Sequence, residues 1–253
     1  MSLLELFDMT DKVVIVTGAS SGLGVSFAQG FAEAGADLVL AARRADRLAE
    51  TAESVRATGR RALVVPADVS VPEQCQAVVD AAVAEFGRVD VLINNAGVAS
   101  AYPATRETPD QFRAVVDVNL HGSYWMAQAC GRVMPAGGSI VNISSILGIT
   151  TAGLPQAAYT ASKAAIIGLT RDLAQQWGSR KGIRVNALAP GFFQSEMTDT
   201  YDEGYAASLM PRVVLGRYGR GEEIAATAVW LASAAGGYIT GQTIAIDGGV
   251  TIT

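Results

Sequence analysis

The chain has 253 residues, a net charge of −5 at pH 7 and a pI near 5.0, and 50% of its residues are hydrophobic. This composition suits one α/β domain with a sizeable core, and excludes a disordered or fibrous protein. It predicts no nucleic-acid partner, because Arg43-Arg44 and Arg60-Arg61 are pairs and form no basic stripe. The sequence contains no apolar run of about 18 residues, so it predicts no membrane span.

The N-terminus and the cysteines indicate the compartment. Residues 1–11 lack the basic start and long apolar core of a signal peptide. Cys75 and Cys130 have neither C-x-x-C spacing nor histidine neighbours, which favours reduced thiols over a disulfide or a metal site. The single histidine, His121, excludes a multi-histidine metal centre. We therefore expect a cytoplasmic protein without a resident metal.

Short β-rich runs alternate with longer helical patterns along the chain. Strands are predicted at residues 12–17, 37–42, 61–66, 89–94, 139–144, 183–188 and 243–247. Helices are predicted from the first glycine-rich turn to about residue 34, over 46–58, 72–86, 109–134 and 222–233, and around Tyr159. This alternation predicts an α/β Rossmann-type fold, a doubly wound seven-stranded parallel sheet with helices on both faces.

The sequence predicts one domain over residues 1–253, since it contains no linker, repeat or low-complexity segment. The least periodic stretch, about 194–220, is rich in tyrosine, methionine, glycine and acidic residues. We expect it to form a mobile substrate-binding loop over one edge of the sheet.

A glycine-rich turn follows the first predicted strand, with the sequence TGASSGLG from Thr17 to Gly24. Glycines between a strand and a helix let the backbone approach a pyrophosphate, whose charge the free N–H groups of the helix N-terminus can meet. Three residues separate the first two glycines, so the spacing differs from the commoner G-x-G-x-x-G. The turn predicts a dinucleotide site, against the alternative of a tight connection with no ligand.

Tyr159 and Lys163 are four residues apart in a helical pattern, so they share one helix face. A free phenol has a pKa of about 10, and lowering it by about 2 to 3 units for use as a base requires about 3 to 4 kcal/mol. One positive charge at about 4 Å supplies roughly that much at an effective dielectric constant near 20. An isolated Y-x-x-x-K is more often a surface pair, so its interpretation depends on the other motifs.

Taken together, the motifs resemble the short-chain dehydrogenase/reductase family, in its compact single-domain branch. They are, in order, TGASSGLG from Thr17, Asp68-Val69, NNAG from Asn94, Asn119 in VNLHG, Ser145 in NISSILG, YTASK from Tyr159, PGFFQSEM from Pro190 and ITGQTIAIDGG from Ile239. The resemblance covers nearly the whole chain, from Lys12 to Gly249. Each motif alone is modest, but eight in order leave little room for coincidence.

The resemblance implies four catalytic residues, Asn119, Ser145, Tyr159 and Lys163. Tyr159 would be the general acid/base, and Lys163 would lower its pKa and hold the nicotinamide ribose. Ser145 would hydrogen-bond the substrate oxygen, with Ser144 as the neighbouring alternative. Asn119 would interrupt its helix and hold a water that links Lys163 to solvent, against the alternative of an ordinary polar helix residue.

The cofactor is expected to be NADP(H) in preference to NAD(H). The second strand ends in Ala41-Ala42-Arg43-Arg44, without the acidic residue that accepts from the ribose of NAD, and Arg43 could grip a 2′-phosphate. Alternatively, both arginines are solvated at the start of a helix, with Arg44 paired to Asp46 or Glu50. The expected cofactor-binding residues are Gly18, Ser20, Ser21, Gly22, Leu23, Gly24, Arg43, Asp68, Val69, Asn95, Ala96, Gly97, Tyr159, Lys163, Pro190, Gly191, Phe193 and Ser195.

The resemblance therefore implies an NADP-dependent oxidoreductase that interconverts a ketone and a secondary alcohol, as a general carbonyl reductase, a 3-oxoacyl carrier-protein reductase or a sugar or polyol dehydrogenase. A carrier-protein substrate would need a basic surface beside the cleft, for which Arg132, Arg180 and Lys181 are the available residues. Lyase, epimerase and non-catalytic nucleotide-sensing relatives are the remaining alternatives; the intact catalytic set disfavours a sensor. Relatives also imply a homotetramer.

Overall fold

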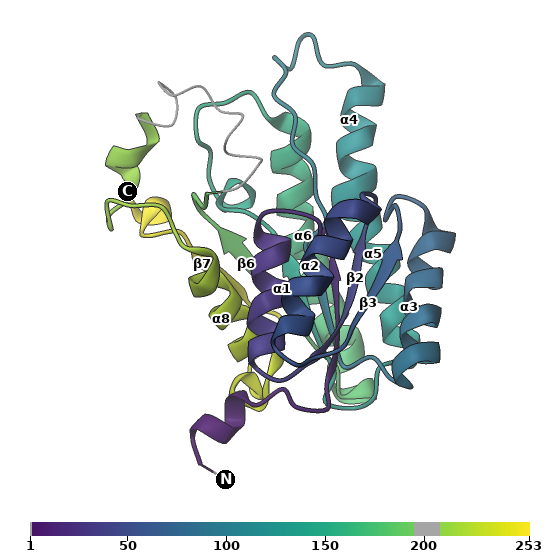
Figure 1. Cartoon of the computed structure of the whole chain (residues 1–253). Coiled ribbons are helices and arrows are strands. Elements are labelled where there is room, and N and C mark those ends of the chain that lie inside the picture. Colours follow the sequence, from purple (N-terminus) through teal and green to yellow (C-terminus); the bar gives the residue numbers. More distant parts are fainter. Residues whose placement is uncertain (1, 195–207) are drawn as a thin grey trace.

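The computed structural model describes residues 2–194 and 208–253 (Figure 1). Seven strands form one parallel sheet in the order β3-β2-β1-β4-β5-β6-β7. The strands are β1 Val13–Thr17, β2 Asp37–Ala42, β3 Ala62–Pro66, β4 Val91–Asn94, β5 Ser139–Ile143, β6 Arg184–Pro190 and β7 Thr243–Ile246. The strand order reverses between β1 and β4, which is where open parallel sheets bind ligands.

Helices connect the strands and cover both faces of the sheet. They are α1 Leu23–Glu33, α2 Ala45–Ala57, α3 Pro72–Phe86, α4 Pro109–Val116, α5 Gly122–Val133, α6 Ala157–Lys181 and α8 Gly221–Ala232. Short 3-10 turns lie at Leu4–Phe7, Ile146–Gly148, Met210–Arg212, Ala234–Gly236 and Val250–Ile252. The predicted Rossmann-type α/β fold is confirmed.

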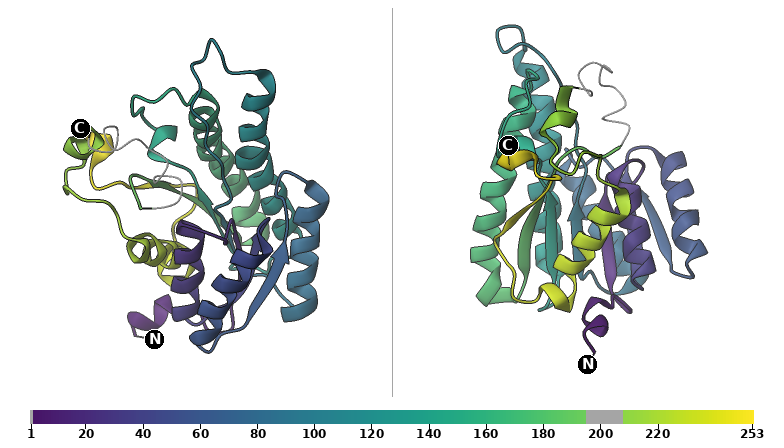
Figure 2. Two further views of the ribbon diagram at one scale, coloured as in Figure 1. Left: turned by 45° about the horizontal axis from the view of Figure 1, so that its top comes forward. Right: turned by 90° about the vertical axis from the view of Figure 1, so that its left-hand side faces the viewer.

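Helices lie on both faces of the sheet (Figure 2), and an apolar layer packs each set of helices against it. On one face α1, α2 and α8 pack through residues such as Phe27, Phe31 and Leu48, all completely buried. On the other face α3, α5 and α6 pack around Met126 and Cys130. Burying these apolar surfaces is the main force that fixes the sheet edge where the site is built.

Most predicted boundaries agree with the structure to within two residues, and the helix at residues 72–86 agrees at both ends. The main difference is the helix predicted over 109–134, which contains a π-helical turn at Asp117–His121 between α4 and α5. Hydrophobic periodicity does not predict a π turn, because one extra residue changes the phase of the pattern by less than a third of a turn.

Part of the expected substrate loop, residues 195–207 with Ser195, lies outside the described residues. The described part, residues 208–220, contains the 3-10 turn Met210–Arg212, and Phe193 forms an isolated bridge with Gly219. Gly219 has no room for a side chain, because the Phe193 ring occupies that space.

No helix within residues 2–194 and 208–253 is both long enough and apolar enough to cross a membrane.

Candidate active site

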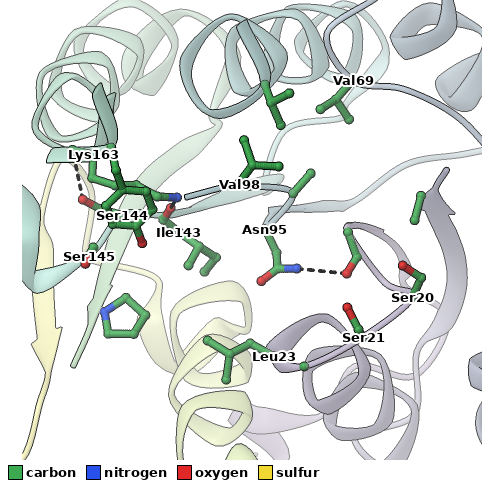
Figure 3. Close-up of a pocket in the computed structure, with 18 of the residues that line it drawn as sticks. Ser20, Ser21, Leu23, Val69, Asn95, Val98, Ile143, Ser144, Ser145 and Lys163 are labelled. Carbon is green, nitrogen blue, oxygen red and sulfur yellow. Dashed lines mark hydrogen bonds between the residues drawn. The ribbon is translucent and has the colours of Figure 1, made fainter. Parts of the chain in front are cut away.

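One large cleft lies at the carboxyl edge of the sheet and extends across the point where the strand order reverses. Figure 3 shows Lys163, Ser144 and Ser145 on one side of it and Ser20 and Ser21 on the other, with Asn95 between them. Among the described residues, every sequence-predicted site residue lines the cleft except Gly24 and Asn119, and Ser195 lies outside the described residues. The lining residues include Gly18, Ser20, Ser21, Gly22, Leu23, Arg43, Asp68, Val69, Asn95, Ala96, Gly97, Ser145, Tyr159, Lys163, Pro190, Gly191 and Phe193.

The glycine-rich turn needs its glycines for separate reasons. Gly18 and Gly22 have positive φ angles, +65° and +54°, which side chains disfavour. A Cβ on Gly18 would also approach the Ala96 Cα to 2.8 Å, and a Cβ on Gly24 would collide with the Gly18 carbonyl. Gly22 caps α1 without a side-chain hydrogen bond, so the first N–H groups of α1 face the cleft as a site for an anion.

Asn95 ties the glycine turn to the strand β4 side of the cleft. Its Nδ2 donates to the carbonyl oxygens of Thr17 at 2.9 Å and Gly18 at 3.3 Å. The Thr17 hydroxyl in turn accepts from the backbone N–H groups of Asn95 and Ala96, each at 3.0 Å. These four hydrogen bonds fix the switch point of the sheet before any ligand binds.

Two arginines lie at the far end of the cleft, after β2. Arg44 donates from Nη2 to the hydroxyls of Ser21 at 2.8 Å and Ser20 at 3.3 Å, so it holds the glycine turn. Arg43 lines the cleft near Asp68. Burial works to raise the pKa of Asp68, but hydrogen bonds from Ser70 and the charge of Arg43 lower it overall.

Arg44 is therefore a site residue that the sequence analysis missed. Of the two acidic residues that the sequence offered as its partners, Asp46 and Glu50, Glu50 pairs with Arg47 at 3.3 Å. Two adjacent arginines give no indication of which one contacts the glycine turn, because the end of a strand leaves the backbone free to twist. The two serines between the glycines were the available signal, since hydroxyls facing a guanidinium are common partners.

Tyr159 and Lys163 lie on the first turns of α6, as their spacing predicts. The Lys163 Nζ is 5.6 Å from the centre of the Tyr159 ring and donates to the Ile143 carbonyl at 2.8 Å. Lys163 is 5% exposed, and this burial lowers its pKa to about 8. A buried ammonium beside a phenol is a local source of positive potential at the reacting end of the cleft.

The two serines after β5 have different surroundings. The hydroxyl of Ser144 donates to the Lys163 carbonyl at 2.7 Å, so it joins β5 to α6. The hydroxyl of Ser145 accepts from the Leu147 N–H at 3.1 Å, which leaves its own proton available to a ligand. The geometry therefore favours Ser145 over Ser144 as the residue that faces a substrate oxygen.

Asn119 lies in the π turn and is 1% exposed. Its Oδ1 accepts from the Val98 N–H at 2.8 Å, and its Nδ2 donates to the Val98 carbonyl at 2.9 Å and the Ser162 hydroxyl at 3.0 Å. Ser162 donates to the Tyr159 carbonyl at 2.7 Å. Asn119 thus connects Val98 with Ser162, which lies between Tyr159 and Lys163 in the sequence. The motifs alone do not predict these contacts.

Gly97 leaves room between two of the catalytic candidates. A Cβ on it would lie 3.3 Å from Asn119 Oδ1 and 3.4 Å from Lys163 Nζ. Side chains larger than hydrogen would therefore press on both groups at once.

In the part of the chain that the structure describes, no three His, Cys, Asp or Glu side chains gather where they could hold a metal ion. Burial raises the pKa of the Cys75 thiol to about 11. Burial also raises the pKa of the Cys130 thiol, by a larger amount. Both cysteines are free thiols.

Comparison with known proteins identifies the class. The family described as enoyl-(acyl carrier protein) reductase matches residues 18–251. The chain belongs to the short-chain dehydrogenase/reductase family and is an oxidoreductase acting on CH–OH donors.

Its relatives include enzymes of different substrate classes. It is 38% identical to 2-dehydro-3-deoxy-D-gluconate 5-dehydrogenase of Dickeya dadantii over 98% of both chains. It is 39% identical to the 3-oxoacyl-[acyl-carrier-protein] reductase FabG of Thermotoga maritima, over 95% of this chain and 98% of that one. Near-equal identities to two activities show the family without fixing the substrate.

Solved structures of the family agree in fold. A short-chain type dehydrogenase/reductase from Mycobacterium marinum superposes with a TM-score of 0.96 at 36% identity, over 100% of both chains. A short chain dehydrogenase from Burkholderia cenocepacia in complex with NADP superposes with a TM-score of 0.91 at 33% identity, over 96% of this chain and 98% of that one.

Proposed function

We propose that this chain is an NADP(H)-dependent oxidoreductase that interconverts a small-molecule ketone and its secondary alcohol. The observation that carries the proposal is a single cleft with an anion site and two arginines at one end. At its other end lie Ser145, Tyr159 and the buried Lys163. NADP(H), when bound, would supply the hydride, and the protein would supply position, a proton and charge.

The glycine turn fits a dinucleotide. Its close approaches at Gly18 and Gly24 leave a backbone cradle that a Cβ would fill, and the N–H groups of α1 face it. Asp68 and Val69 would flank the adenine, and Asn95, Ala96 and Gly97 would line the middle of the cleft. Pro190, at the end of β6, and Gly191 and Phe193, just after it, would lie beside the nicotinamide.

The chain's own groups would carry the proton chemistry. The Tyr159 hydroxyl donates a proton to the carbonyl oxygen in reduction and takes it back in oxidation. Ser145 donates a hydrogen bond to the same oxygen and stabilises the charge that develops there. Lys163 favours the ionised phenol by its charge.

Asn119 would complete a proton path. Its side chain is engaged with Val98 and Ser162, and its main-chain carbonyl accepts from the Ser123 hydroxyl at 2.7 Å. This carbonyl lies in the π turn, and a water bound near it would connect Lys163 with solvent.

A preference for NADP(H) over NAD(H) is supported by Arg43, which lines the cleft where an acidic residue would accept from the ribose of NAD. The NADP complex of the Burkholderia cenocepacia relative supports the same cofactor.

The second candidate is a 3-oxoacyl carrier-protein reductase, supported by the family description and the Thermotoga maritima relative. Its expected basic residues are Arg132, Arg180 and Lys181. Lys181 ends α6, 22 residues beyond Tyr159, which is about 33 Å at 1.5 Å per residue. Arg132 is in the last turn of α5, at the edge of the sheet opposite the cleft. Within one chain, these residues do not flank the cleft, which favours the small-molecule substrate.

The test is a substrate panel followed at the nicotinamide absorbance band with NADPH and NADH, in both reaction directions. It should include sugar acids, simple ketones and 3-oxoacyl groups on pantetheine and on the carrier protein. Turnover of small ketones or keto acids with NADPH supports the proposal. Turnover of carrier-bound substrate alone would establish the second candidate.

We also infer a homotetramer in the cytoplasm. β7 lies at the edge of the sheet, so its outer N–H and C=O groups are available for pairing with another chain. Cys75 and Cys130 are buried free thiols, as expected in a reducing compartment. Sedimentation velocity at micromolar concentration tests the assembly; a monomer would exclude it.

A further inference from the structure

The last seven residues of the sequence, Asp247–Thr253, lie beside the substrate end of the cleft. They follow β7, and Val250–Ile252 form a 3-10 turn. In Figure 1 this yellow segment lies against the green segment that follows residue 208. Val250 is 0% exposed although Ile252, two residues later, is 82% exposed. One buried valine in an exposed turn indicates a specific packing contact.

Val250 packs behind the wall of the cleft. It forms an apolar cluster with Ile146 and Val213, against which Leu147, Phe192 and Met210 pack. Ile146, Leu147 and Phe192 also line the cleft itself. Ile146 directly follows Ser145, and the Leu147 N–H donates to the Ser145 hydroxyl. Val250 therefore supports the same short segment that presents the candidate catalytic serine.

Asp247 anchors the segment that carries Val250. Its carboxylate accepts from the N–H groups of Gly249 at 3.0 Å and Thr251 at 2.8 Å, and from the Thr251 hydroxyl at 2.7 Å. Gly191, in the cofactor part of the cleft, has no room for a Cβ because the Asp247 Cα would be 2.7 Å away. The anchor is thus itself packed against the cleft.

Two glycines hold the segment against residues 213–215. Gly248 and Gly249 have φ angles of +60° and +90°. A Cβ on either would lie 2.9 Å from a Val213 methyl or 2.8 Å from Val214. The Leu215 N–H donates to the Gly248 carbonyl at 3.0 Å. This close backbone contact holds Val250 where its side chain is buried against Ile146 and Val213.

Two further hydrogen bonds join this segment to residues 210–212 and 146–151. The Thr253 hydroxyl donates to the Arg212 carbonyl at 3.2 Å, and Arg212 donates from Nη1 to the Thr151 carbonyl at 3.0 Å. Residues 146–151, 210–216 and 247–253 therefore form one unit on the substrate side.

We propose that Val250 is a specificity-determining positioning residue, which sets the width of the substrate end of the cleft by supporting Ile146 and Leu147 from behind. The expected effect on substrate preference rests on the proposed function. The expected effect on the position of Ile146 and Leu147 rests on packing alone. A smaller residue lets the wall retract, and a larger one pushes it inward.

The test compares Val250→Ala and Val250→Ile in the full chain, with a series of methyl ketones from butanone to octanone and acetophenone, and NADPH. Val250→Ala should raise kcat/KM for the bulkiest substrate relative to the smallest by about fivefold or more, mainly through KM. Val250→Ile should lower the same ratio. The Kd for NADPH should stay within about twofold in both.

The matched control is Val55→Ala, which removes the same two methyl groups from a completely buried valine on α2, in the separate apolar core between α2 and the sheet. An equal change of the substrate ratio in Val55→Ala, or no change in either Val250 variant, overturns the inference.

A second readout does not need activity. Val250→Ala should speed amide hydrogen exchange at Leu147–Thr150, whose N–H groups bond within that turn, and Val55→Ala should not. Unchanged exchange there overturns the positioning role. Accelerated exchange in a protein that reduces none of the ketones would keep that role and count against the proposed function alone.

Discussion

The two ends of the cleft are built in different ways. The nucleotide end is formed by backbone, with left-handed glycines at residues 18 and 22 and hydrogen bonds from Asn95 and Thr17. The substrate end is formed by apolar side chains from three separate segments, clustered around Ile146, Val213 and Val250. A site formed by backbone geometry tolerates few residue types, whereas many combinations of apolar side chains can form a packed wall. The first end can therefore be conserved in chemistry while the second changes in shape.

Tyr159→Phe tests the point where the two ends meet, and has the largest expected effect. Loss of the phenolic proton should lower kcat by a factor of about 1,000 or more, while the Kd for NADPH stays within about threefold. Turnover is measured at the nicotinamide band, and nucleotide binding by fluorescence titration. Tyr238→Phe is the control, because Tyr238 is fully exposed and outside the cleft. Ketone reduction by Tyr159→Phe near the wild-type rate would show the catalytic assignment to be wrong.

Arg43→Ala tests the nucleotide end. Removing a charged hydrogen-bond donor to a phosphate should weaken NADPH by about 10- to 100-fold, and NADH by less than about threefold. Arg47→Ala is the control, since Arg47 is exposed on α2 and pairs with Glu50. Equal losses for both nucleotides, measured as Kd, would exclude a contact between Arg43 and the 2′-phosphate.

Lys163→Met tests the cost of building the reacting end. Burial lowers the pKa of Lys163 to about 8, so below about pH 8 the folded protein carries the full cost of a buried ammonium. As the pH rises from about 8 to the unfolded value of about 10.5, the unfolded chain binds more protons, so wild-type stability increases. The variant should be more stable than wild type at pH 7, by about 2 kcal/mol after loss of the Ile143 hydrogen bond, and inactive.

This advantage should shrink towards pH 10.5, as measured by urea unfolding of the nucleotide-free protein at several pH values. Lys181→Met is the matched control, because Lys181 is on the same helix and also donates to a backbone carbonyl, at 2.8 Å, from an exposed position. A difference between Lys163→Met and wild type that does not depend on pH would contradict the buried-charge explanation.

Arg44→Ala has the smallest expected effect and separates the two arginines. Since Arg44 donates to Ser20 and Ser21, its loss should loosen the glycine turn and weaken NADPH and NADH alike, by about three- to tenfold. A loss confined to NADPH would instead place Arg44 on the 2′-phosphate.

The sequence predicts the fold well, because the residue patterns of buried strands and glycine turns are compatible with few alternative structures. It also predicts that Tyr159 and Lys163, which share one short motif, lie together at the cleft. It does not predict Arg44, whose role depends on the direction in which a side chain leaves the end of β2. Nor does it predict Ser162 or Val250, which act through contacts between segments far apart in the chain.

The substrate end is the least predictable part for the same reason. An isoleucine, a valine or a leucine there has no chemical group that indicates a function. The shape of the pocket depends on how side chains from three segments pack together. No spacing rule connects Val250 to Ile146, more than 100 residues earlier in the sequence.

The π turn at Asp117–His121 restricts how this chain can vary in length. The Gly122 N–H reaches back five residues to the Asp117 carbonyl, so the turn holds one residue more than an α-helix would. Deleting any one residue from it would restore a regular helix and rotate everything beyond by about 100°. Met126 would then leave the core, and Asn119 would lose Ser162. Insertions and deletions in homologous chains should therefore accumulate before Pro109 or after Val133, and an alignment gap between those positions would mark a chain in which the contact between Asn119 and Ser162 is built differently.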